Sequence, residues 1–137
     1  MAIQSIYAQS TEGVVEIFPE FHQGLLDLEG FERIWLIYWF HRITGSKLIV
    51  KPFRDDSERG LFATRAPCRP NPIGISVVRL LEVLDGKMRI AGVDVLDGTP
   101  LLDIKPYVHD WDAFPESRSG WLGNASERTV ADNRFSS

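Results

Sequence analysis

The chain has 137 residues, of which 44% are hydrophobic and 25% are charged, and its formal net charge is −4. These totals predict one compact domain, and they exclude a disordered chain or a surface that coats nucleic acid throughout. No apolar run approaches the ~20 residues of a membrane span, and a single cysteine excludes an internal disulfide. We therefore expect a cytoplasmic protein that binds neither a membrane nor a metal.

The first part of the chain predicts strands around one short helical turn. The first eleven residues show no strand pattern, whereas Val14–Phe18 is typical of a strand that Pro19 ends. The apolar spacing within Phe21–Gly30 predicts a turn of helix. The seven apolar residues Ile34–Phe40 predict a strand buried on both faces. Whether the chain's own core or another subunit covers the second face is left open. Leu48–Val50 predicts a further strand.

The next segment, Arg59–Gly74, is rich in arginine and proline. Its sixteen residues hold three arginines, three prolines and two glycines, with no acidic residue. Proline fixes φ and pushes the preceding residue towards extended backbone, so the segment predicts a stiff, non-helical loop. A stiff loop would hold guanidinium groups ready for a carboxylate or a phosphate. A proline-rich connection with incidental arginines explains the composition equally well.

Strand patterns return after this loop. Ile75–Leu84 and Met88–Leu96 predict two strands joined by a hairpin at Asp85-Gly86. A turn at Asp97–Pro100 and a short strand at Leu101–Ile104 follow. Many short strands separated by turn residues predict an all-β fold, a small single-sheet β-barrel with short helical turns. The chain has no glycine-rich dinucleotide turn, so a Rossmann fold is not expected.

The composition changes at Pro115, where the chain becomes polar and rich in serine. We therefore expect a barrel domain over residues 1–114. A C-terminal tail over residues 115–137 is expected to be partly docked or disordered. No repeat or linker marks a second domain.

Two polar clusters follow the arginine-rich loop. Asp94 and Asp97 stand where a strand meets a turn, and their carboxylates either form an ordinary turn or bond a ribose hydroxyl or an ammonium. Asp103, Lys105 and Tyr107 alternate, so on a strand all three would share one face, as a small polar site requires. A salt-bridged surface turn is the alternative for this second cluster.

These motifs together resemble the TsaA-like (TrmO) family. The resemblance covers residues 2–112 and is carried by Glu12–Glu20, Trp35–His41, Phe62–Gly74, Asp94–Pro100 and Asp103–Tyr107. It implies a small non-Rossmann β-barrel that forms a homodimer, with its cofactor, S-adenosyl-L-methionine, near the subunit interface. The family's characterised activity is methylation of N6 of threonylcarbamoyladenosine beside the anticodon, which implies tRNA as the partner.

The resemblance also implies individual site residues. Arg65 would hold the cofactor, and Ile75 would line the pocket below the loop. The other implied cofactor contacts are Gln4, His41, Arg42, Asp94, Val95, Leu96, Asp97 and Gly98. Arg59, Arg69 and Asn71 are the candidates for binding substrate.

The catalytic candidates are Asp103, Lys105 and Tyr107. An amide-like nitrogen is a poor nucleophile, so a base or a hydrogen-bond acceptor should assist it. Asp103 and Tyr107 are the candidates for that role, and Lys105 would contact a carboxylate or a phosphate of the substrate. A methyltransferase of the same fold acting on another small molecule or RNA, and a non-catalytic cofactor-binding barrel, are the alternatives.

The sequence departs from the family pattern at two places. The family's opening Ile-Gly-x-Ile segment has no counterpart here, which would leave the barrel without an edge strand. The Pro-x-Gln motif that follows it reads Ala2-Ile3-Gln4, so only its glutamine is kept. The usual Thr-Arg-Ser-Pro reads Thr64-Arg65-Ala66-Pro67, which loses one hydroxyl.

Overall fold

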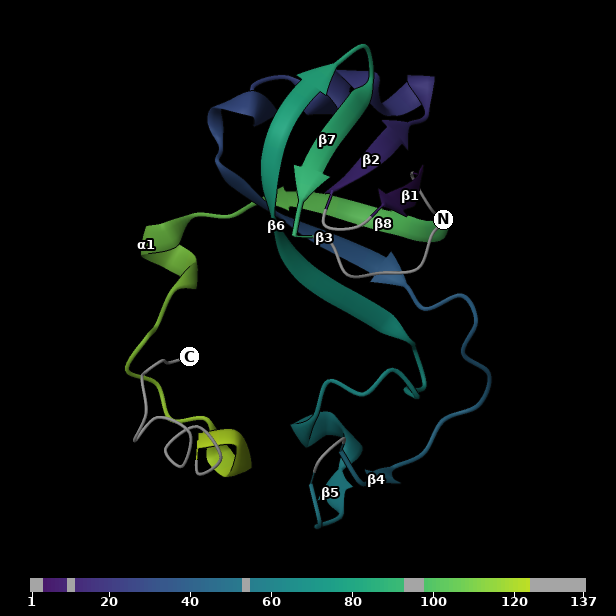
Figure 1. Cartoon of the computed structure of the whole chain (residues 1–137), viewed down its shortest axis with the longest axis vertical. Helices are drawn as coiled ribbons and strands as arrows, with labels where there is room; N and C mark the ends of the chain where they lie inside the picture. Colours follow the sequence, from purple (N-terminus) through teal and green to yellow (C-terminus); the bar gives the residue numbers. More distant parts are fainter. Residues whose placement is uncertain (1–3, 10–11, 53–54, 93–97, 124–137) are drawn as a thin grey trace. The chain divides into compact units, whose positions relative to one another are not determined.

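The computed structural model describes residues 4–9, 12–52, 55–92 and 98–123, without the side chains of residues 4–9. The chain divides into two compact units, Met1–Tyr107 and Val108–Ser137. In the first unit, six strands form a closed antiparallel barrel in the order β1-β2-β7-β6-β3-β8 (Figure 1). These strands are β1 (Gln4–Gln9), β2 (Glu12–Ile17), β3 (Arg33–Trp39), β6 (Ile73–Leu84), β7 (Lys87–Ala91) and β8 (Thr99–Pro106). The predicted barrel is thus confirmed.

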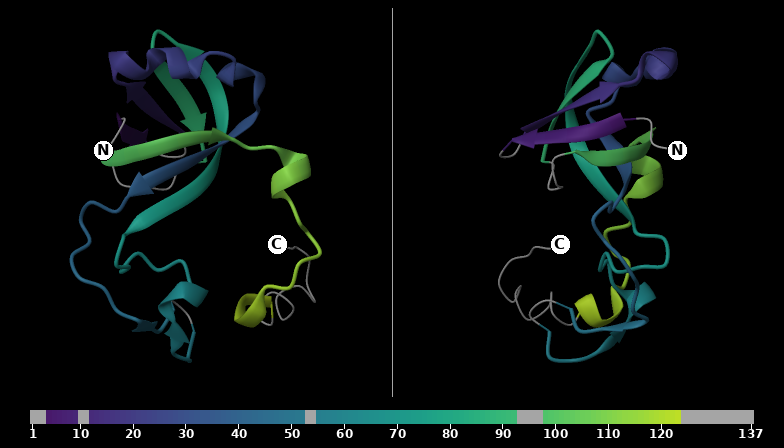
Figure 2. Two further views of the ribbon diagram at one scale, coloured as in Figure 1. Left: turned by 180° about the vertical axis from the view of Figure 1, so that it is seen from behind. Right: turned by 90° about the vertical axis from the view of Figure 1, so that its right-hand side faces the viewer.

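The remaining elements are short. The 3₁₀ helices η1 (Pro19–Leu25) and η2 (Leu28–Gly30) follow β2, as the apolar spacing there predicts. Strands β4 (Ile49–Val50) and β5 (Arg59–Gly60) pair with each other, and the 3₁₀ helix η3 (Leu61–Ala63) comes next. The two views in Figure 2 show η1 against the β6–β7 hairpin.

The core follows the two-residue period of the strands, because alternate side chains of a strand point to one face. Ile34, Leu36 and Tyr38 of β3 are buried, whereas the intervening Trp35 and Ile37 are half-buried. Leu25 of η1 and Leu28 of η2 join the same core cluster. The other buried members are Val15, Ile17, Val78, Met88, Ile90 and Leu101.

Two expectations from the sequence are wrong. Gln4–Gln9 forms β1, which pairs with both β2 and β8, so this barrel has no missing edge strand. Backbone hydrogen bonds to β2 and β8 hold this strand in place. Because these bonds do not depend on side chains, the sequence of residues 4–9 shows no strand pattern. Thr99 and Pro100 belong to β8, where Pro100 is the second residue and lies opposite Ser5, so the predicted turn does not extend to them.

Strand β3 was expected to be buried on both faces, with either the chain's own core or another subunit covering the second face. Its inner face is buried, but the outer face is only partly covered in the described part of the chain, and Trp39 keeps 36% of its surface exposed. The run of seven apolar residues therefore exceeds what the barrel core needs. The predicted strand Met88–Leu96 is confirmed as far as Ala91; its positions 93–96 lie outside the described residues.

The second unit is described from Val108 to residue 123. Its helix α1 (His109–Asp112) is a single turn, and the Asp112 carboxylate accepts a hydrogen bond from the Val108 N–H at 2.9 Å. Within the described ranges, no helix of either unit has the length and apolar content to span a bilayer. The boundary expected near residue 114 stays a prediction.

The β6–β7 hairpin turns at Asp85 and Gly86, both with positive φ (53° and 73°), as the sequence predicts. The His22 imidazole of η1 lies over Gly86, and a hydrogen bond joins His22 Nε2 to the Ile17 carbonyl at 2.7 Å. A methyl group at Gly86 would collide with this ring. Gly86 therefore allows η1 to dock on the hairpin.

We expect Gly86→Ala to be more destabilising than Gly92→Ala in chemical denaturation. Both glycines have positive φ, but only at Gly86 would an added Cβ meet a neighbour. Gly92→Ala should cost about 1–2 kcal/mol of backbone strain. Gly86→Ala should cost about 0.5–1.5 kcal/mol more, because the His22 ring must leave its hydrogen bond. Equal losses for the two variants would contradict the docking role of Gly86.

Candidate functional site

A pocket of about 350 Å³ lies where the arginine-rich loop joins the barrel. Its walls come from the end of β3, the start of β6 and the loop itself. The lining residues are Tyr38, Phe40, Thr64, Arg65, Arg69, Ile73, Gly74 and Ile75. We call this the arginine pocket. Its volume falls in the usual range for a small-molecule site, about 300–1,000 Å³.

Backbone hydrogen bonds join the start of the connection between β3 and β6 to its end, which is also the end of the arginine-rich loop. Trp39, the last residue of β3, pairs with Ile73, the first of β6. Beyond this pair, the Phe40 N–H donates to the Pro72 carbonyl at 2.7 Å. The chain therefore leaves the barrel and returns to it at the same point, and the loop arginines are held close to the strand ends.

Arg69 stabilises the loop from inside. Its guanidinium Nη1 donates to the carbonyls of Thr64 and Ala66, both at 2.9 Å. The guanidinium also lies 5.8 Å from the centre of the Phe62 ring, within the range of a cation–π contact. Arg69 was predicted to bind substrate. It lines the pocket, and two of its hydrogen bonds also hold the loop backbone in place.

Arg65 differs from Arg69 in its surroundings. Its side chain lines the pocket and is exposed, and among the described residues it forms no ion pair. Thr64, its neighbour, is fixed by a hydrogen bond from its hydroxyl to the Leu61 carbonyl at 2.8 Å. A guanidinium on an ordered loop suits a carboxylate, because its planar fork matches two carboxylate oxygens.

The apolar wall of the pocket depends on close packing at Gly74. A Cβ at Gly74 would collide with the Tyr38 ring and would lie 2.8 Å from the Phe40 ring. The two rings meet edge to face at 5.5 Å, and the Tyr38 hydroxyl is hydrogen-bonded to the Ser76 hydroxyl at 2.7 Å. Sequence reasoning missed Tyr38, Phe40 and Gly74 as pocket residues.

The catalytic candidates lie on the outer face of the barrel. The register places Asp103 opposite Ile37, which in turn lies opposite Ile75 of the arginine pocket. Lys105 follows on the same face, and its ammonium lies 3.0 Å from the Asp103 carboxylate. The Asp103 carboxylate also accepts the Ile104 N–H at 2.8 Å. Strands lie about 4.8 Å apart, so the Asp103 backbone is about 10 Å from that of Ile75.

Tyr107 and Trp35 complete this outer face. Their rings pack at 5.8 Å, and Trp35 lies opposite Lys105. The structure thus brings Asp103, Lys105 and Tyr107 onto one face, although none of them lines the arginine pocket.

Of the other predicted cofactor residues, His41, Arg42 and Gly98 do not line the arginine pocket. His41 and Arg42 directly follow Phe40 and are exposed. Gln4 pairs through its backbone with Leu101, which lies opposite Tyr38, and Gly98 immediately precedes β8. These segments therefore meet near the arginine pocket. The predicted contacts Asp94, Val95, Leu96 and Asp97 lie outside the described residues.

Two predicted substrate residues lie outside the pocket lining. Arg59 forms an ion pair with Asp55 at 3.0 Å, and this hydrogen bond holds the pKa of the Asp55 carboxyl below its usual value. Asn71 is exposed, and its carbonyl accepts the Ile73 N–H at 2.8 Å. Within the described ranges, no group of three His, Cys, Asp or Glu side chains is arranged to hold a metal ion.

Comparison with known proteins decides the family. The model of the tRNA-methyltransferase O N-terminal domain matches residues 1–113. The chain belongs to this family. The resemblance found in the sequence is thereby confirmed, together with its implication of an S-adenosylmethionine-dependent methyltransferase family.

The chain is also similar in sequence to individual proteins that bind S-adenosyl-L-methionine or methylate tRNA, according to their names. A probable S-adenosyl-L-methionine-binding protein from Pyrococcus abyssi is 53% identical over 136 residues, which cover 97% of this chain and 74% of that protein. A mouse tRNA (adenine(37)-N6)-methyltransferase is 38% identical, over 71% of this chain and 23% of its own length. The cofactor expected from the sequence is the one named in several of these relatives.

Solved structures of related proteins have the same fold as this chain. The crystal structure of TrmO from Pseudomonas aeruginosa matches with a TM-score of 0.70 and 35% identity, over 88% of this chain and 60% of that one. A second TrmO crystal structure matches with a TM-score of 0.73 and 38% identity, over 87% and 61%. The chain thus spans about 60% of the length of these solved relatives.

We expect Arg69→Ala to destabilise the loop, whereas Arg65→Ala should leave stability unchanged. Losing hydrogen bonds from a charged group costs about 1.5–3 kcal/mol, and only Arg69 makes such bonds to the loop backbone. Chemical denaturation measures the cost, and hydrogen exchange at Thr64 and Ala66 locates it. A stability loss of equal size in both variants would show that the two arginines do not differ in this way.

Proposed function

We propose that this protein is a methyltransferase that binds S-adenosyl-L-methionine in the arginine pocket and methylates N6 of threonylcarbamoyladenosine beside the anticodon of tRNA. The observation that carries the proposal is the arrangement of the arginine pocket. A guanidinium without an ionic partner among the described residues lies beside two aromatic rings. On the outer face, Ile75, Ile37 and Asp103 lie side by side on three neighbouring strands.

The lining of the pocket fits the cofactor's chemical groups. The Arg65 guanidinium would hold the carboxylate of the methionine part. The partly buried Phe40 ring, which packs edge to face on the buried Tyr38 ring, offers an aromatic surface that attracts a sulfonium, and Ile73 and Ile75 offer apolar contact for an adenine. When bound, the cofactor supplies a methyl group activated by its positive sulfur. The chain's task is to align that group with the acceptor and to exclude water.

Asp103 is the residue proposed to assist the acceptor nitrogen. N6 of the substrate is amide-like, and it must lose its hydrogen as the new N–C bond forms and the S–C bond breaks. The Asp103 carboxylate, oriented by the Ile104 N–H and the Lys105 ammonium, would accept that proton or bond to it. Lys105 would also attract the substrate's carboxylate, and Tyr107 would flank the substrate from its position against Trp35.

The distribution of charge along the sequence supports an RNA partner. Four arginines and no acidic residue occur between Arg59 and Arg79, in a chain of net charge −4. A local basic site on an acidic body favours one phosphate-bearing partner over nucleic acid in general. Arg59, Asn71 and Arg69 remain the proposed substrate contacts, and His41 and Arg42 the proposed cofactor contacts. A tRNA-modifying role would place the protein in the cytoplasm.

We also propose that the protein acts as a homodimer through the outer face of β3 and β6. Trp39, Ile73 and Ile75 are 36%, 44% and 48% exposed on this face, and they border the arginine pocket. Contiguous exposed apolar side chains usually mark a contact with another protein. A second copy on this face would shield the apolar side chains and leave the cofactor pocket near the interface.

Methyl transfer by the purified protein tests the proposed activity. We expect transfer from labelled S-adenosyl-L-methionine to tRNA that carries threonylcarbamoyladenosine, and none to the same tRNA without it. Arg65→Ala should weaken cofactor binding about 10- to 150-fold, because a charged hydrogen bond contributes about 1.5–3 kcal/mol. Arg118→Ala removes an exposed arginine of the second unit and serves as the matched control.

Three results would contradict parts of this proposal. Cofactor binding without transfer to either tRNA would favour a different acceptor or a non-catalytic binding protein. Unchanged cofactor affinity in Arg65→Ala would remove Arg65 from the site. Equal transfer to both tRNAs would show that the threonylcarbamoyl group is not recognised.

The solution mass tests the dimer. We expect about twice the 15.5 kDa of one chain. Trp39→Lys combined with Ile73→Lys should yield a monomer, because two charges would enter an apolar contact. Leu84→Lys, at the hairpin end of β6 with 61% exposure, is the matched control and should stay dimeric. A monomeric wild-type protein, or a double variant that remains dimeric, would rule out this interface.

A further inference from the structure

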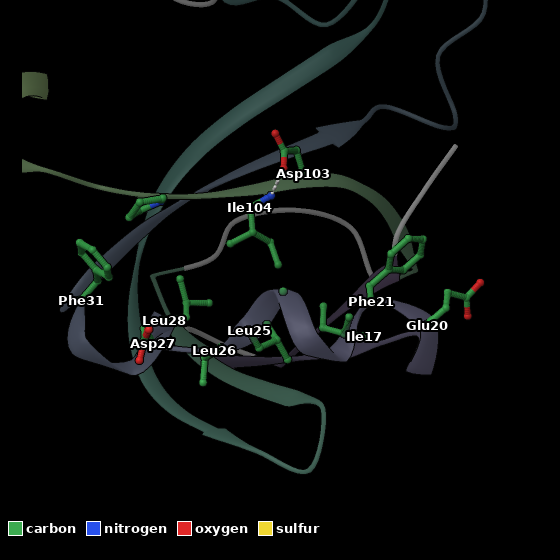
Figure 3. A pocket seen from close by; sticks show the side chains of 12 residues that line it. Ile17, Glu20, Phe21, Leu25, Leu26, Asp27, Leu28, Phe31, Asp103 and Ile104 are labelled. Carbon is green, nitrogen blue, oxygen red and sulfur yellow. Dashed lines mark hydrogen bonds between the residues drawn. The ribbon is translucent and has the colours of Figure 1, made fainter.

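A second pocket, of about 540 Å³, lies beneath η1 and η2 and shares no lining residue with the arginine pocket (Figure 3). It is bounded by the end of β2, the two 3₁₀ helices, Phe31 and the last part of β8. Its lining residues are Ile17, Glu20, Phe21, Gly24, Leu25, Leu26, Asp27, Leu28, Phe31, Asp103, Ile104 and Pro106. We call it the η1 pocket, and we propose that it binds a small hydrophobic amine in its protonated, cationic form.

The inner wall of the η1 pocket is part of the barrel core. Ile17, Leu25 and Leu28 are 5%, 8% and 9% exposed, and they belong to the central hydrophobic cluster. Phe21 and Ile104 are partly buried against that cluster. A ligand that enters the pocket therefore meets a continuous apolar surface, which selects an aliphatic or aromatic body.

Among the described residues, the ionisable side chains that line the pocket are all acidic. The lining holds three carboxylates, from Glu20, Asp27 and Asp103, and no lysine, arginine or histidine. Lys105 pairs with Asp103, but in the described part of the chain neither Glu20 nor Asp27 forms an ion pair. Figure 3 shows Glu20 and Asp27 at opposite ends of the row formed by Ile17, Leu25 and Leu28.

The apolar wall and the carboxylates together determine which class of ligand the η1 pocket can bind. The Glu20 and Asp27 carboxylates at the margin attract a cation and repel a carboxylate or a phosphate, so a small anion does not suit the pocket. The apolar wall disfavours a bare metal ion, which needs several oxygen ligands. An ammonium group attached to a hydrophobic body satisfies both features, because its charge faces Glu20 or Asp27 while its body covers the leucines.

Three probes with the same body and different charge test the proposal on the wild-type protein. Phenylbutylamine is cationic at neutral pH, phenylbutanol is neutral and phenylbutanoate is anionic. We expect amide shifts in the NMR spectrum of isotope-labelled protein to cluster at η1, η2 and the end of β8 when the amine is added. The alcohol should bind about three- to tenfold more weakly than the amine, and the carboxylate should bind more weakly still.

Glycine variants test the location. Gly24 lines the pocket, and an added Cβ there would meet no atom within 4 Å, so Gly24→Leu should fill the pocket without displacing the core. Gly30→Leu is the matched control, because Gly30 has equally open surroundings and does not line the pocket. Gly24→Leu should abolish binding of phenylbutylamine, and Gly30→Leu should preserve it.

A second pair of variants tests the charges. Glu20→Gln with Asp27→Asn should remove the preference for the amine over the alcohol, whereas Glu29→Gln, an exposed carboxylate of η2 outside the lining, should leave it unchanged. The proposal is overturned by equal binding of amine and alcohol to the wild-type protein, by shifts located elsewhere, or by no binding at all. The probe series needs no variant, so a variant that fails to fold does not prevent the test.

Discussion

The hydrogen bond between the Phe40 N–H and the Pro72 carbonyl, at 2.7 Å, is the contact on which the candidate site depends. It continues the pairing of Trp39 with Ile73 by one residue, and it joins the start and the end of the connection between β3 and β6, which contains the arginine-rich loop. Inside the loop, Arg69 holds the carbonyls of Thr64 and Ala66. One arginine thus orders the backbone, and a neighbouring arginine, Arg65, is left available to a ligand.

The barrel register joins this loop to the rest of the proposed site. Leu101 lies opposite both Gln4 and Tyr38, and Tyr38 lies opposite Gly74. Four segments that are distant in sequence therefore meet in one row next to the arginine pocket. Because Gly74 has no side chain, the Tyr38 and Phe40 rings can pack against the backbone of β6. The same register presents Asp103 and Ile75 on the outer face.

Sequence patterns predicted the structural elements that depend on residues close together in the chain. Strand-forming residues between turn signals predicted β2, β6 and β7, and Asp85-Gly86 predicted the hairpin, because each prediction follows from residues close together in the chain. The family motif made Arg65 and Ile75 candidates for cofactor contacts, and both residues line the arginine pocket. What the sequence did not reveal depends on contacts between distant segments. The strand Gln4–Gln9 pairs through its backbone, and the fit of Gly74 against Tyr38 requires knowledge of the register.

The most direct test of the central claim is a crystal structure of the protein with S-adenosylhomocysteine, the cofactor without its methyl group. The account predicts the ligand in the arginine pocket, with its carboxylate on the Arg65 guanidinium and its sulfur facing Tyr38 or Phe40. It also predicts a second copy of the chain against the outer face of β3 and β6. A ligand bound elsewhere, with Arg65 in contact with solvent alone, would contradict the account.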